Sequence, residues 1–268
     1  MVVLYAVVSL TSLGPRGTSA SWCSKIKENS KLTFEKNYSM NKIITKIMSE
    51  SLFYKNAAIY WSKVPPTVEG VLGGYGYISN VDIDGSKKFL ADILASKNPP
   101  AIKRALDCGA GIGRISKYLL APQSETVDLV EQDEKFINTA KKFIGKHNVK
   151  IGTLYQIGLQ NFKPVNTYDL IWCQWVLGHL KDYDLVDFFE RCRNSLNENG
   201  VIVVKENITL GGEIEYDEVD SSVTRPPALL EKIFEEAKLK IIKSEAQQDL
   251  PEHLYPVHMF ALVPQEVE

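Results

Sequence analysis

Apolar and polar positions follow two different rhythms along this chain. Between residues 49 and 63 apolar side chains recur at helical spacing, and Pro65 and Pro66 end the helix. From residue 105 onward, short apolar runs alternate with longer amphipathic segments. The runs predict strands at 105–107, 127–131, 150–156, 168–174, 201–205, 239–244 and 258–263, and the amphipathic segments predict helices at 84–96, 112–120, 133–144, 181–196 and 228–237.

This alternation is typical of an α/β protein with a doubly wound, mostly parallel sheet and helices on both faces. We expect seven strands in a Rossmann-like arrangement, preceded by N-terminal helices. Residues 65–79, PPTVEGVLGGYGYIS, are rich in glycine and tyrosine and long enough to form a lid or binding loop. In open α/β sheets, ligands bind beyond the carboxyl ends of the strands. Candidate chemistry is therefore expected in the segments that directly follow a strand.

Composition narrows the class of protein without identifying it. The chain has 268 residues, a net charge of −2 and 44% hydrophobic residues, which is ordinary for a soluble globular protein and gives no indication of a broad nucleic-acid-binding surface. No apolar run is long enough to cross a bilayer. The cysteines lack the spacing of a zinc site or a disulfide framework, which favours a reducing compartment: Cys23, Cys108, Cys173 and Cys192. We expect no metal, no membrane partner and no direct nucleic-acid partner.

The first 47 residues differ from the rest of the chain. An apolar stretch, MVVLYAVVSL, precedes a basic, serine-rich segment that is low in acids. A targeting segment and a disordered or upstream-translated extension both fit this composition. We expect 48–268 to form one domain. In it, 48–98 would supply N-terminal helices and a substrate loop, and 99–268 a cofactor-binding core with an acidic loop at 206–225.

The most informative motif is LDCGAGIGR at 106–114, which lies between a predicted strand and a predicted helix. Glycine allows a backbone to take positive φ or to approach a ligand closely, and helix-initial N–H groups favour anions. A dinucleotide-binding fingerprint would need a third glycine where the chain has Arg114. A nicotinamide or flavin cofactor is therefore disfavoured, while a simple tight turn stays open as an alternative.

The same motif, read from Asp107 to Gly113 as D-x-G-x-G-x-G, resembles the first motif of class I S-adenosylmethionine-dependent methyltransferases. The resemblance implies S-adenosylmethionine as the cofactor and S-adenosylhomocysteine as its product. Gly109 and Gly111 would pass below the methionine part, Arg114 would pair with its carboxylate, and Glu131 would receive the ribose hydroxyls. The remaining cofactor contacts implied are Gln132, Asp133, Leu159, Gln160 and Gln174.

Five further segments carry a more specific resemblance: YWSKVPPTVEGVLGGYGYIS, LDCGAGIGRISK, IWCQWVLGHL, VVKENI and DEVDSSVTR. Over 48–263 the chain resembles the eukaryotic protein N-terminal α-amino methyltransferases, which act on Xaa-Pro-Lys termini. The resemblance implies that Asn207 and Asp220 hold the amine and that Asp220 or His179 accepts its proton. It also implies substrate contacts from Tyr60, Trp61, Leu72, Gly73, Ile78, Trp175, Asp217, Ser222 and Tyr255. The other acids of the loop, Glu213, Glu215 and Glu218, are expected to be solvated.

The chemistry of such a reaction fits this set of residues. Methyl transfer from a sulfonium needs a neutral amine, and an α-amine has a pKa of about 7.7 to 8.0, against about 10.4 for a lysine side chain. Near neutral pH, a useful fraction of α-amines is therefore already neutral. Positioning should dominate catalysis, because well-oriented reactants gain roughly 7 to 11 kcal/mol.

Three other functions share parts of this pattern. A small-molecule methyltransferase would have the same fold and cofactor but gives no reason for an apolar slot beside paired acids. A noncatalytic scaffold would be expected to lack Asn207 and Asp220, and a nucleic-acid methyltransferase to carry an NPPY-like motif or a basic stripe. The chain departs from the family at Glu131, where aspartate is common, at KEN for KDN, and by one extra residue between Asn207 and Asp220. The resemblance further implies a monomer in the nucleus and cytoplasm.

Overall fold

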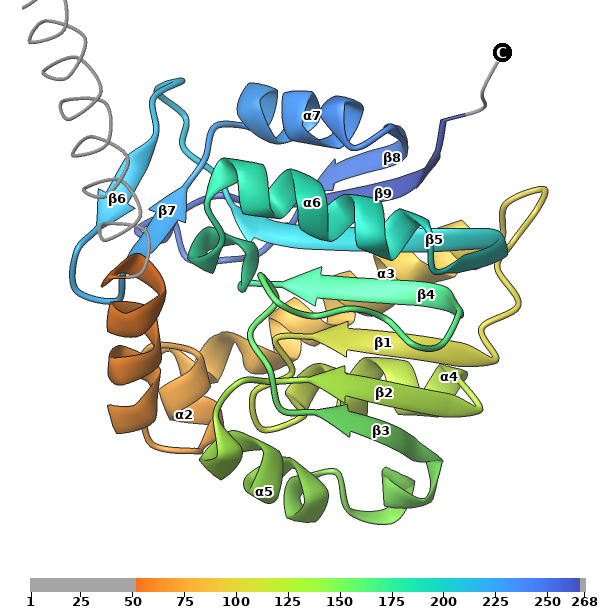
Figure 1. Ribbon diagram of the computed structural model, residues 1–268, viewed down its shortest axis with the longest axis horizontal. Coiled ribbons are helices and arrows are strands. Elements are labelled where there is room, and N and C mark those ends of the chain that lie inside the picture. The colour runs from red at the N-terminus through yellow and green to blue at the C-terminus, as the bar shows by residue number, and fades with distance from the viewer. Residues whose placement is uncertain (1–51, 266–268) are drawn as a thin grey trace, which may run out of the picture. The chain divides into compact units, whose positions relative to one another are not determined.

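A seven-stranded sheet forms the centre of the protein (Figure 1). The computed structural model describes residues 52–265, so the predicted extension at 1–47 and the predicted domain start at 48 lie outside the described residues. The strand order is β3 (Ile151–Tyr155), β2 (Thr126–Val130), β1 (Arg104–Cys108), β4 (Tyr168–Gln174), β5 (Leu196–Asn207), β9 (Val257–Pro264) and β8 (Leu239–Ala246). Within this sheet, β9 alone runs antiparallel to its neighbours. The predicted doubly wound, mostly parallel sheet is confirmed.

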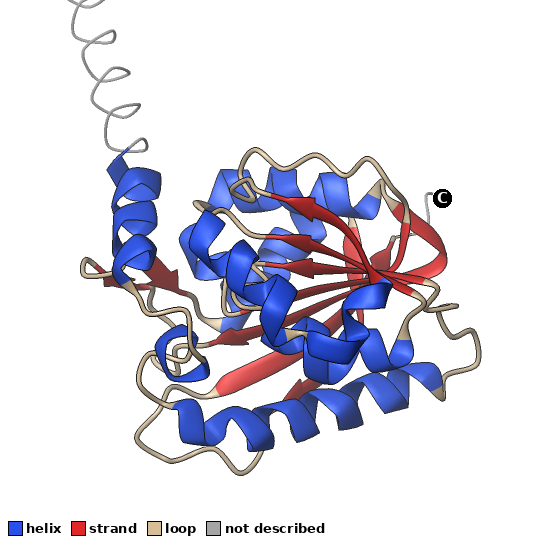
Figure 2. Cartoon of the chain, turned by 90° about the horizontal axis from the view of Figure 1, so that it is seen from below, coloured by secondary structure: helices blue, strands red, loops and turns tan. Residues whose placement is uncertain are grey.

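Helices cover both faces of the sheet (Figure 2). One face packs against α6 (Asp182–Arg193) and α7 (Pro227–Glu236), and the other against α3 (Ser79–Leu94), α5 (Glu134–Phe143) and a helix at 114–123. The helix at 114–123 contains a π-helical turn, Ser116–Leu120, and ends as α4 (Ala121–Gln123). Because both faces are covered, β4 is buried along its whole length, which explains its uninterrupted apolar sequence.

The chain before α3 is more structured than predicted. Thr67 caps the short helix α2 (Val68–Val71) by accepting the N–H of Gly70, and a 3₁₀ turn at Gly76–Ile78 leads directly into α3. The glycine and tyrosine content of this segment indicated a long loop. Composition alone does not reveal that Thr67 can cap a helix at this point. Residues 65–79 therefore form successive helical turns rather than one irregular lid.

The predicted start of α3 at residue 84 is also wrong, since the helix begins at Ser79. The predicted helix 84–96 already contained Gly85, although glycine has a low helix propensity. In the structure Gly85 lies inside α3, and a Cβ there would come within 2.1 Å of the Gln247 Oε1 atom. Close packing against a side chain from elsewhere in the chain thus overrides the local preference.

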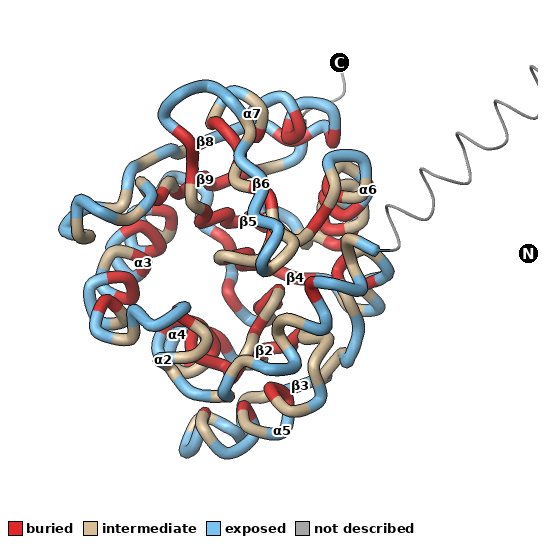
Figure 3. The backbone as a smooth tube through the Cα atoms, turned by 90° about the vertical axis from the view of Figure 1, so that its left-hand side faces the viewer, coloured by how far each residue is buried: buried red, intermediate tan, exposed pale blue. Residues whose placement is uncertain are grey.

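An antiparallel hairpin occupies the acidic loop at 206–225. It consists of β6 (Glu215–Asp217) and β7 (Ser222–Thr224), neither of which the sequence pattern predicted. All three residues of β6 are exposed, so no alternation of buried and exposed positions marks the strand. Figure 3 faces the edge where the parallel strands end and shows this hairpin in front of the buried strands.

A helix at 52–63 ends just before Pro65, as predicted, and lies beside the same edge of the sheet (Figure 1). Within 52–265, no helix is both long enough and apolar enough to cross a membrane. The same residues contain no cluster of three or more histidine, cysteine or acidic side chains suited to a metal ion.

Candidate active site

The glycine turn that follows β1 takes a left-handed backbone at three positions. φ is +70° at Gly109, +53° at Gly111 and +78° at Gly113, where a side chain is strained. A Cβ on Gly109 would lie 2.4 Å from a methyl group of Val176, and one on Gly113 would lie 2.8 Å from Ile144. Gly111 has only Val71 nearby, at 3.5 Å. Packing thus fixes the outer two glycines, while the backbone at Gly111 stays open to a ligand.

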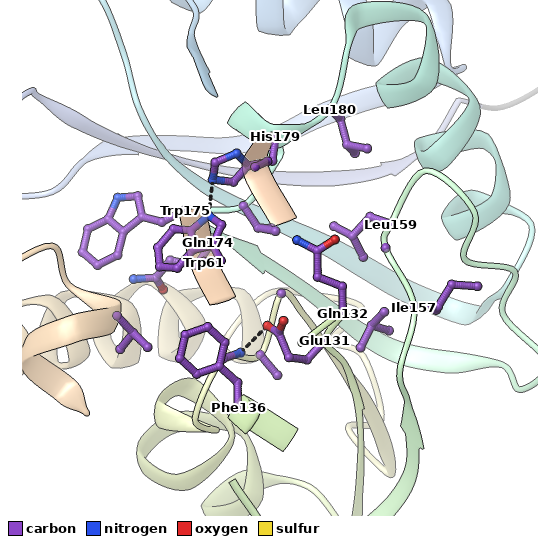
Figure 4. Close-up of a pocket in the computed structure, with 18 of the residues that line it drawn as sticks. Trp61, Glu131, Gln132, Phe136, Ile157, Leu159, Gln174, Trp175, His179 and Leu180 are labelled. Atoms are coloured by element: carbon purple, nitrogen blue, oxygen red, sulfur yellow. Dashed lines mark hydrogen bonds between the residues drawn. The ribbon is translucent and has the colours of Figure 1, made fainter. Parts of the chain in front are cut away.

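A pocket lies beyond this turn, at the carboxyl ends of β1, β2 and β4 (Figure 4). Its wall combines the glycine turn with residues that follow β2 and β4, which is the position where open α/β sheets bind nucleotide-like ligands. Eleven of the residues singled out in the sequence line it: Trp61, Gly109, Gly111, Arg114, Glu131, Gln132, Leu159, Gln160, Gln174, Trp175 and His179. Sequence reasoning missed several apolar members of the wall, among them Tyr54, Val71, Phe136, Ile157 and Val176.

Glu131 ties the glycine turn to the end of β2. Its Oε2 atom accepts the N–H of Gly111 at 2.9 Å, and its Oε1 atom accepts the N–H of Asp133 at 2.9 Å. Burial raises the pKa of this carboxyl, although the backbone N–H groups that it accepts oppose the shift. Asp133 does not line the pocket as expected. Its side chain instead accepts the N–H of Lys135 and caps α5.

Arg114 and Gln174 form a polar part of the pocket wall, and behind them both contact Asp82, an acid that the sequence analysis missed. The Nη1 atom of Arg114 donates to the Oδ2 atom of Asp82 at 2.6 Å, and the Nε2 atom of Gln174 donates to its Oδ1 atom at 2.7 Å. The guanidinium also lies over the ring of Trp175, 5.6 Å from the centroid. The sequence did contain one sign of Asp82, because an acid between the apolar residues Val81 and Ile83 can indicate a buried carboxylate.

These residues fit S-adenosylmethionine on chemical grounds. An acid follows the second strand, an open glycine backbone crosses the floor, and a buried arginine suited to a carboxylate lies in the wall. Aromatic and aliphatic side chains, Phe136 and Ile157 among them, supply the apolar surface that an adenine ring needs. Figure 4 shows Glu131 and Gln132 close to the apolar side chains of Phe136 and Ile157.

His179 lies at the rim of the pocket with both ring nitrogens engaged (Figure 4). The indole N–H of Trp61 donates to its Nε2 atom at 2.8 Å, and its Nδ1 atom is 3.3 Å from the carbonyl oxygen of Ser221. An indole N–H can only donate, so Nε2 is the acceptor and Nδ1 carries the proton. Burial lowers the pKa of this imidazole, against opposing effects of Asp220, the Ser221 carbonyl and Asp217. His179 is therefore a neutral side chain in a fixed orientation.

Two polar atoms at this edge are buried without a partner among the described residues: Oδ1 of Asp220 and the indole Nε1 of Trp175. An unsatisfied buried group costs about 1–3 kcal/mol. Backbone strain accompanies both, since φ is +51° at Trp175 and +59° at Ser221, next to Asp220. Such costs are typical of sites that a ligand completes. Asp220 precedes Ser221, whose carbonyl oxygen faces His179, so Asp220 lies beside the rim rather than in the pocket wall.

The other proposed substrate residues are distributed around the rim. Asn207 is the half-buried last residue of β5. Asp217 and Ser222 face each other across the hairpin, and the Asp217 side chain accepts the N–H of Val219 at 2.7 Å. The Tyr255 hydroxyl donates to Glu215 at 2.5 Å, so this exposed acid is not purely solvated as expected.

The predicted proline slot falls into two groups. Trp175 lines the pocket, whereas Leu72 and Ile78 are buried residues outside its wall, and Gly73 is exposed with φ +59°. Tyr60 lines a separate hollow that helix 52–63 forms with the 218–219 tip of the hairpin. The structure therefore brings Trp61, Trp175 and His179 together at one pocket, but not Leu72 or Ile78.

Three neighbours anchor helix 52–63 beside the pocket. The Lys135 ammonium donates to the carbonyl oxygens of Trp61, Ser62 and Val64 at 3.1, 2.8 and 2.6 Å. The Tyr54 hydroxyl donates to Asp184 of α6 and accepts the N–H of Lys181. The helix that carries Trp61 is thus held by α5 at one end and by α6 at the other.

The sheet order, the glycine turn and the acid at the end of β2 define a class I S-adenosylmethionine-dependent methyltransferase. The family model for the AdoMet dependent proline di-methyltransferases, AdoMet being S-adenosylmethionine, matches residues 49–263. The chain belongs to this family.

Relatives and solved structures agree with this membership. The chain is 48% identical to N-terminal Xaa-Pro-Lys N-methyltransferase 1-A of Xenopus laevis and 45% identical to N-terminal Xaa-Pro-Lys N-methyltransferase 1 of Homo sapiens; each alignment covers 81% of this chain and 97% of the relative. A SAM-dependent methyltransferase from Leishmania major has a TM-score of 0.73 and 38% identity, covering 78% of this chain and 82% of its own. A glycopeptide N-methyltransferase bound to S-adenosylmethionine, at 12% identity and a TM-score of 0.54, covers 67% of this chain and 87% of its own and shows the shared fold alone.

Proposed function

We propose that this protein transfers methyl groups from S-adenosylmethionine to the free α-amine of protein N-termini of the Xaa-Pro-Lys type. Relatives of 45–48% identity carry this activity in their names. The observation in the structure that carries the proposal is the buried Oδ1 atom of Asp220 at the rim of the cofactor pocket, which has no hydrogen-bond partner within residues 52–265. A buried acceptor for which this part of the chain supplies no donor suits a ligand that brings N–H groups.

When bound, S-adenosylmethionine supplies a methyl group on a positively charged sulfur. The chain must then orient a neutral amine toward it. Asp220 Oδ1 would accept an N–H of the incoming ammonium and take up its proton, directly or through water. The Asn207 side-chain oxygen, at the carboxyl end of β5, would accept a second N–H and so direct the lone pair.

The alternative proton acceptor, His179, is less suited to the role. Both of its nitrogens already have protein partners, and freeing Nε2 would break the bond from Trp61. Burial keeps the pKa of His179 low, so the ring adds no positive charge beside an ammonium substrate. We therefore propose that Asp220 accepts the proton of the amine and that His179 orients the side chain of Trp61.

The hairpin and the segment before α3 would recognise the rest of the terminus. Asp217 and Ser222, paired across the hairpin, suit the lysine in the third position, and Trp175 supplies apolar surface for the proline. Leu72, Gly73 and Ile78 would line the peptide path from the other side, with Tyr60, Trp61 and Tyr255 around it. The small-molecule methyltransferase alternative is disfavoured, because the relatives act on protein termini.

Three peptides test the proposal directly. The protein is incubated with labelled S-adenosylmethionine and an SPKRIA peptide, its N-acetylated form, or a form with alanine in place of proline. We expect methyl transfer to the first peptide, none to the acetylated peptide, and at least a roughly tenfold lower kcat/KM with alanine, because an apolar slot would go unfilled. Equal labelling of all three peptides would rule out recognition of a free Xaa-Pro terminus.

Replacing Lys135 by methionine is expected to raise KM for the peptide roughly 5- to 20-fold with a smaller change in kcat. The variant removes a charged group that holds three carbonyl oxygens at the end of helix 52–63, where a cation also favours the helix dipole. Trp61 would then be held less firmly against His179. Initial rates at varied peptide concentration give both constants.

The matched control is Lys141→Met, an exposed lysine on the same helix α5. It should leave both constants within about twofold, since surface substitutions of this kind have small effects. Identical behaviour of the two variants would show that the anchor on helix 52–63 has no role in peptide binding.

We further propose, from the resemblance, that the protein is a monomer that works in the nucleus and cytoplasm. Equilibrium sedimentation of the full chain tests the first point, and imaging of the tagged full chain in cells tests the second. Exclusive localisation in another organelle would favour a targeting role for the first 47 residues instead.

A further inference from the structure

Asp82 is a fully buried carboxylate that meets donors from three different elements. The Nη1 atom of Arg114 is 2.6 Å from its Oδ2 atom, and the Nε2 atom of Gln174 and the Nζ atom of Lys205 are 2.7 and 2.5 Å from its Oδ1 atom. These donors come from the helix after the glycine turn, from β4 and from β5. The cost of removing charges from water can exceed the gain from pairing them, so this cluster is an arrangement that the fold maintains at some cost.

Two buried cations share this one carboxylate. Among the described residues, the only acid in an ion pair with either Arg114 or Lys205 is Asp82. Another buried acid, Asp107, accepts instead from the N–H and hydroxyl of Ser116. Burial raises the pKa of Asp107 to about 6, against the opposing effects of these hydrogen bonds and of Arg114. The cluster therefore suits a second carboxylate, provided by a ligand.

Arg114 lines the pocket, while Asp82 and Lys205 lie behind it. With Nη1 held on Asp82 and the guanidinium carbon over the ring of Trp175, the side chain of Arg114 is constrained at two points before any ligand arrives. A planar guanidinium gains most in recognition of carboxylates when it is oriented in this way.

We propose that Asp82 is the positioning residue of Arg114: it holds the guanidinium so that the free N–H groups receive the carboxylate of the methionine part of the cofactor. The inference rests on the proposed cofactor contact of Arg114 and extends it to a residue that touches no ligand. Asp82 also belongs to the helix that continues from Ile78, so the same carboxylate joins the cofactor wall to the segment assigned to the peptide.

The effect of Asp82→Asn follows from the number of acceptors. An asparagine side chain offers one oxygen, and its NH₂ group would face cations and another amide donor. Arg114 would lose its charged partner and its fixed orientation. A ligand with a carboxylate should suffer from this change, whereas a ligand without one should not.

Two ligands separate positioning from general destabilisation. S-adenosylhomocysteine carries the amino-acid part, and 5′-methylthioadenosine lacks it but keeps the adenine, the ribose and the sulfur. By calorimetry with the full chain, we expect Asp82→Asn to weaken the first ligand about 10- to 30-fold and the second less than about threefold, as for loss of a charge-assisted contact. Arg114→Gln should show the same selectivity, and the double variant should be no weaker than the weaker single variant.

Asp128→Asn is the matched control. Asp128 is also a fully buried carboxylate with several partners, Arg104 and Tyr168 among them, but it lies in β2 away from the pocket. It should lower thermal stability while the ratio of the two affinities stays unchanged. If Asp82→Asn does not fold, Asp82→Asn combined with Lys205→Met removes the unpaired cation and is measured in its place.

Three results would overturn the proposal. Equal weakening of both ligands by Asp82→Asn would reduce Asp82 to a structural role. Fully additive effects of Asp82→Asn and Arg114→Gln would show that the residues act independently. If Arg114→Gln left the ratio of the two affinities unchanged, Arg114 would not bind the carboxylate of the cofactor. The proposed function is tested separately, since methylation of the SPKRIA peptide by the unmodified protein would still support it.

Discussion

Asp220→Asn is expected to lower kcat for peptide methylation by about 10²- to 10⁴-fold, the range for loss of a positioned proton acceptor. Asparagine has nearly the same shape but neither accepts a proton nor attracts an ammonium. The buried Oδ1 atom has no partner among the described residues, and the neighbouring His179 already has both ring nitrogens engaged, so a substitute acceptor would require this hydrogen bonding to break. Single-turnover rates with saturating peptide and cofactor measure the change.

Cofactor binding supplies the internal reference for this variant. Asp220 does not line the cofactor pocket, so the affinity for S-adenosylhomocysteine should change by less than about threefold. Glu218→Gln, an exposed acid of the same hairpin, is the matched control and should retain normal kcat. Loss of S-adenosylhomocysteine binding in Asp220→Asn, or normal turnover, would contradict the assigned role.

The sheet and the cofactor pocket were predictable because they depend on local patterns. Strands buried on both faces appear as apolar runs, and β4 matches its predicted bounds at 168–174. The glycine turn lies just after one predicted strand and Glu131 is the last residue of the next, so the ends of neighbouring strands bring them together. Glycines with positive φ carry their structural requirement in their identity.

The residues that the sequence did not reveal depend on contacts between distant segments. Asp82 stands between two apolar residues, and its partners Arg114, Gln174 and Lys205 are 32, 92 and 123 positions away in the chain. The anchor of helix 52–63 by Lys135 likewise spans more than 70 residues. The hairpin at 215–224 escaped prediction because exposed strands need no apolar alternation. Its acids were found through resemblance rather than through their pattern.

The protonation of His179 also depends on a contact between distant segments and could not be predicted from the sequence. Resemblance left Asp220 and His179 as alternative proton acceptors. The hydrogen bond from Trp61 distinguishes them, because it occupies the ring nitrogen that would have to accept the proton. Such a choice of tautomer depends on an indole that is 118 positions away in the chain.

Gly109→Ala is expected to reduce the affinity for S-adenosylhomocysteine by more than about 100-fold and to abolish measurable methyl transfer. An alanine at φ +70° costs about 1–2 kcal/mol by itself. Its Cβ would also lie 2.4 Å from Val176, far inside contact distance. Calorimetric titration with S-adenosylhomocysteine and thermal unfolding measure affinity and stability on the same samples.

The clash cannot be relieved cheaply, because Val176 is itself fixed. The N–H groups of Val176 and Leu177 both donate to the Oε1 atom of the buried Glu206, each at 2.8 Å. Either the glycine turn or the segment that follows Trp175 must therefore move, and both line the pocket. Gly145→Ala separates strain from the clash, since φ is +65° there and no atom lies within 4 Å of the added Cβ. It should lose only the part of the stability that comes from strain and should retain normal affinity, whereas normal binding by Gly109→Ala would show that the turn does not form the cofactor site.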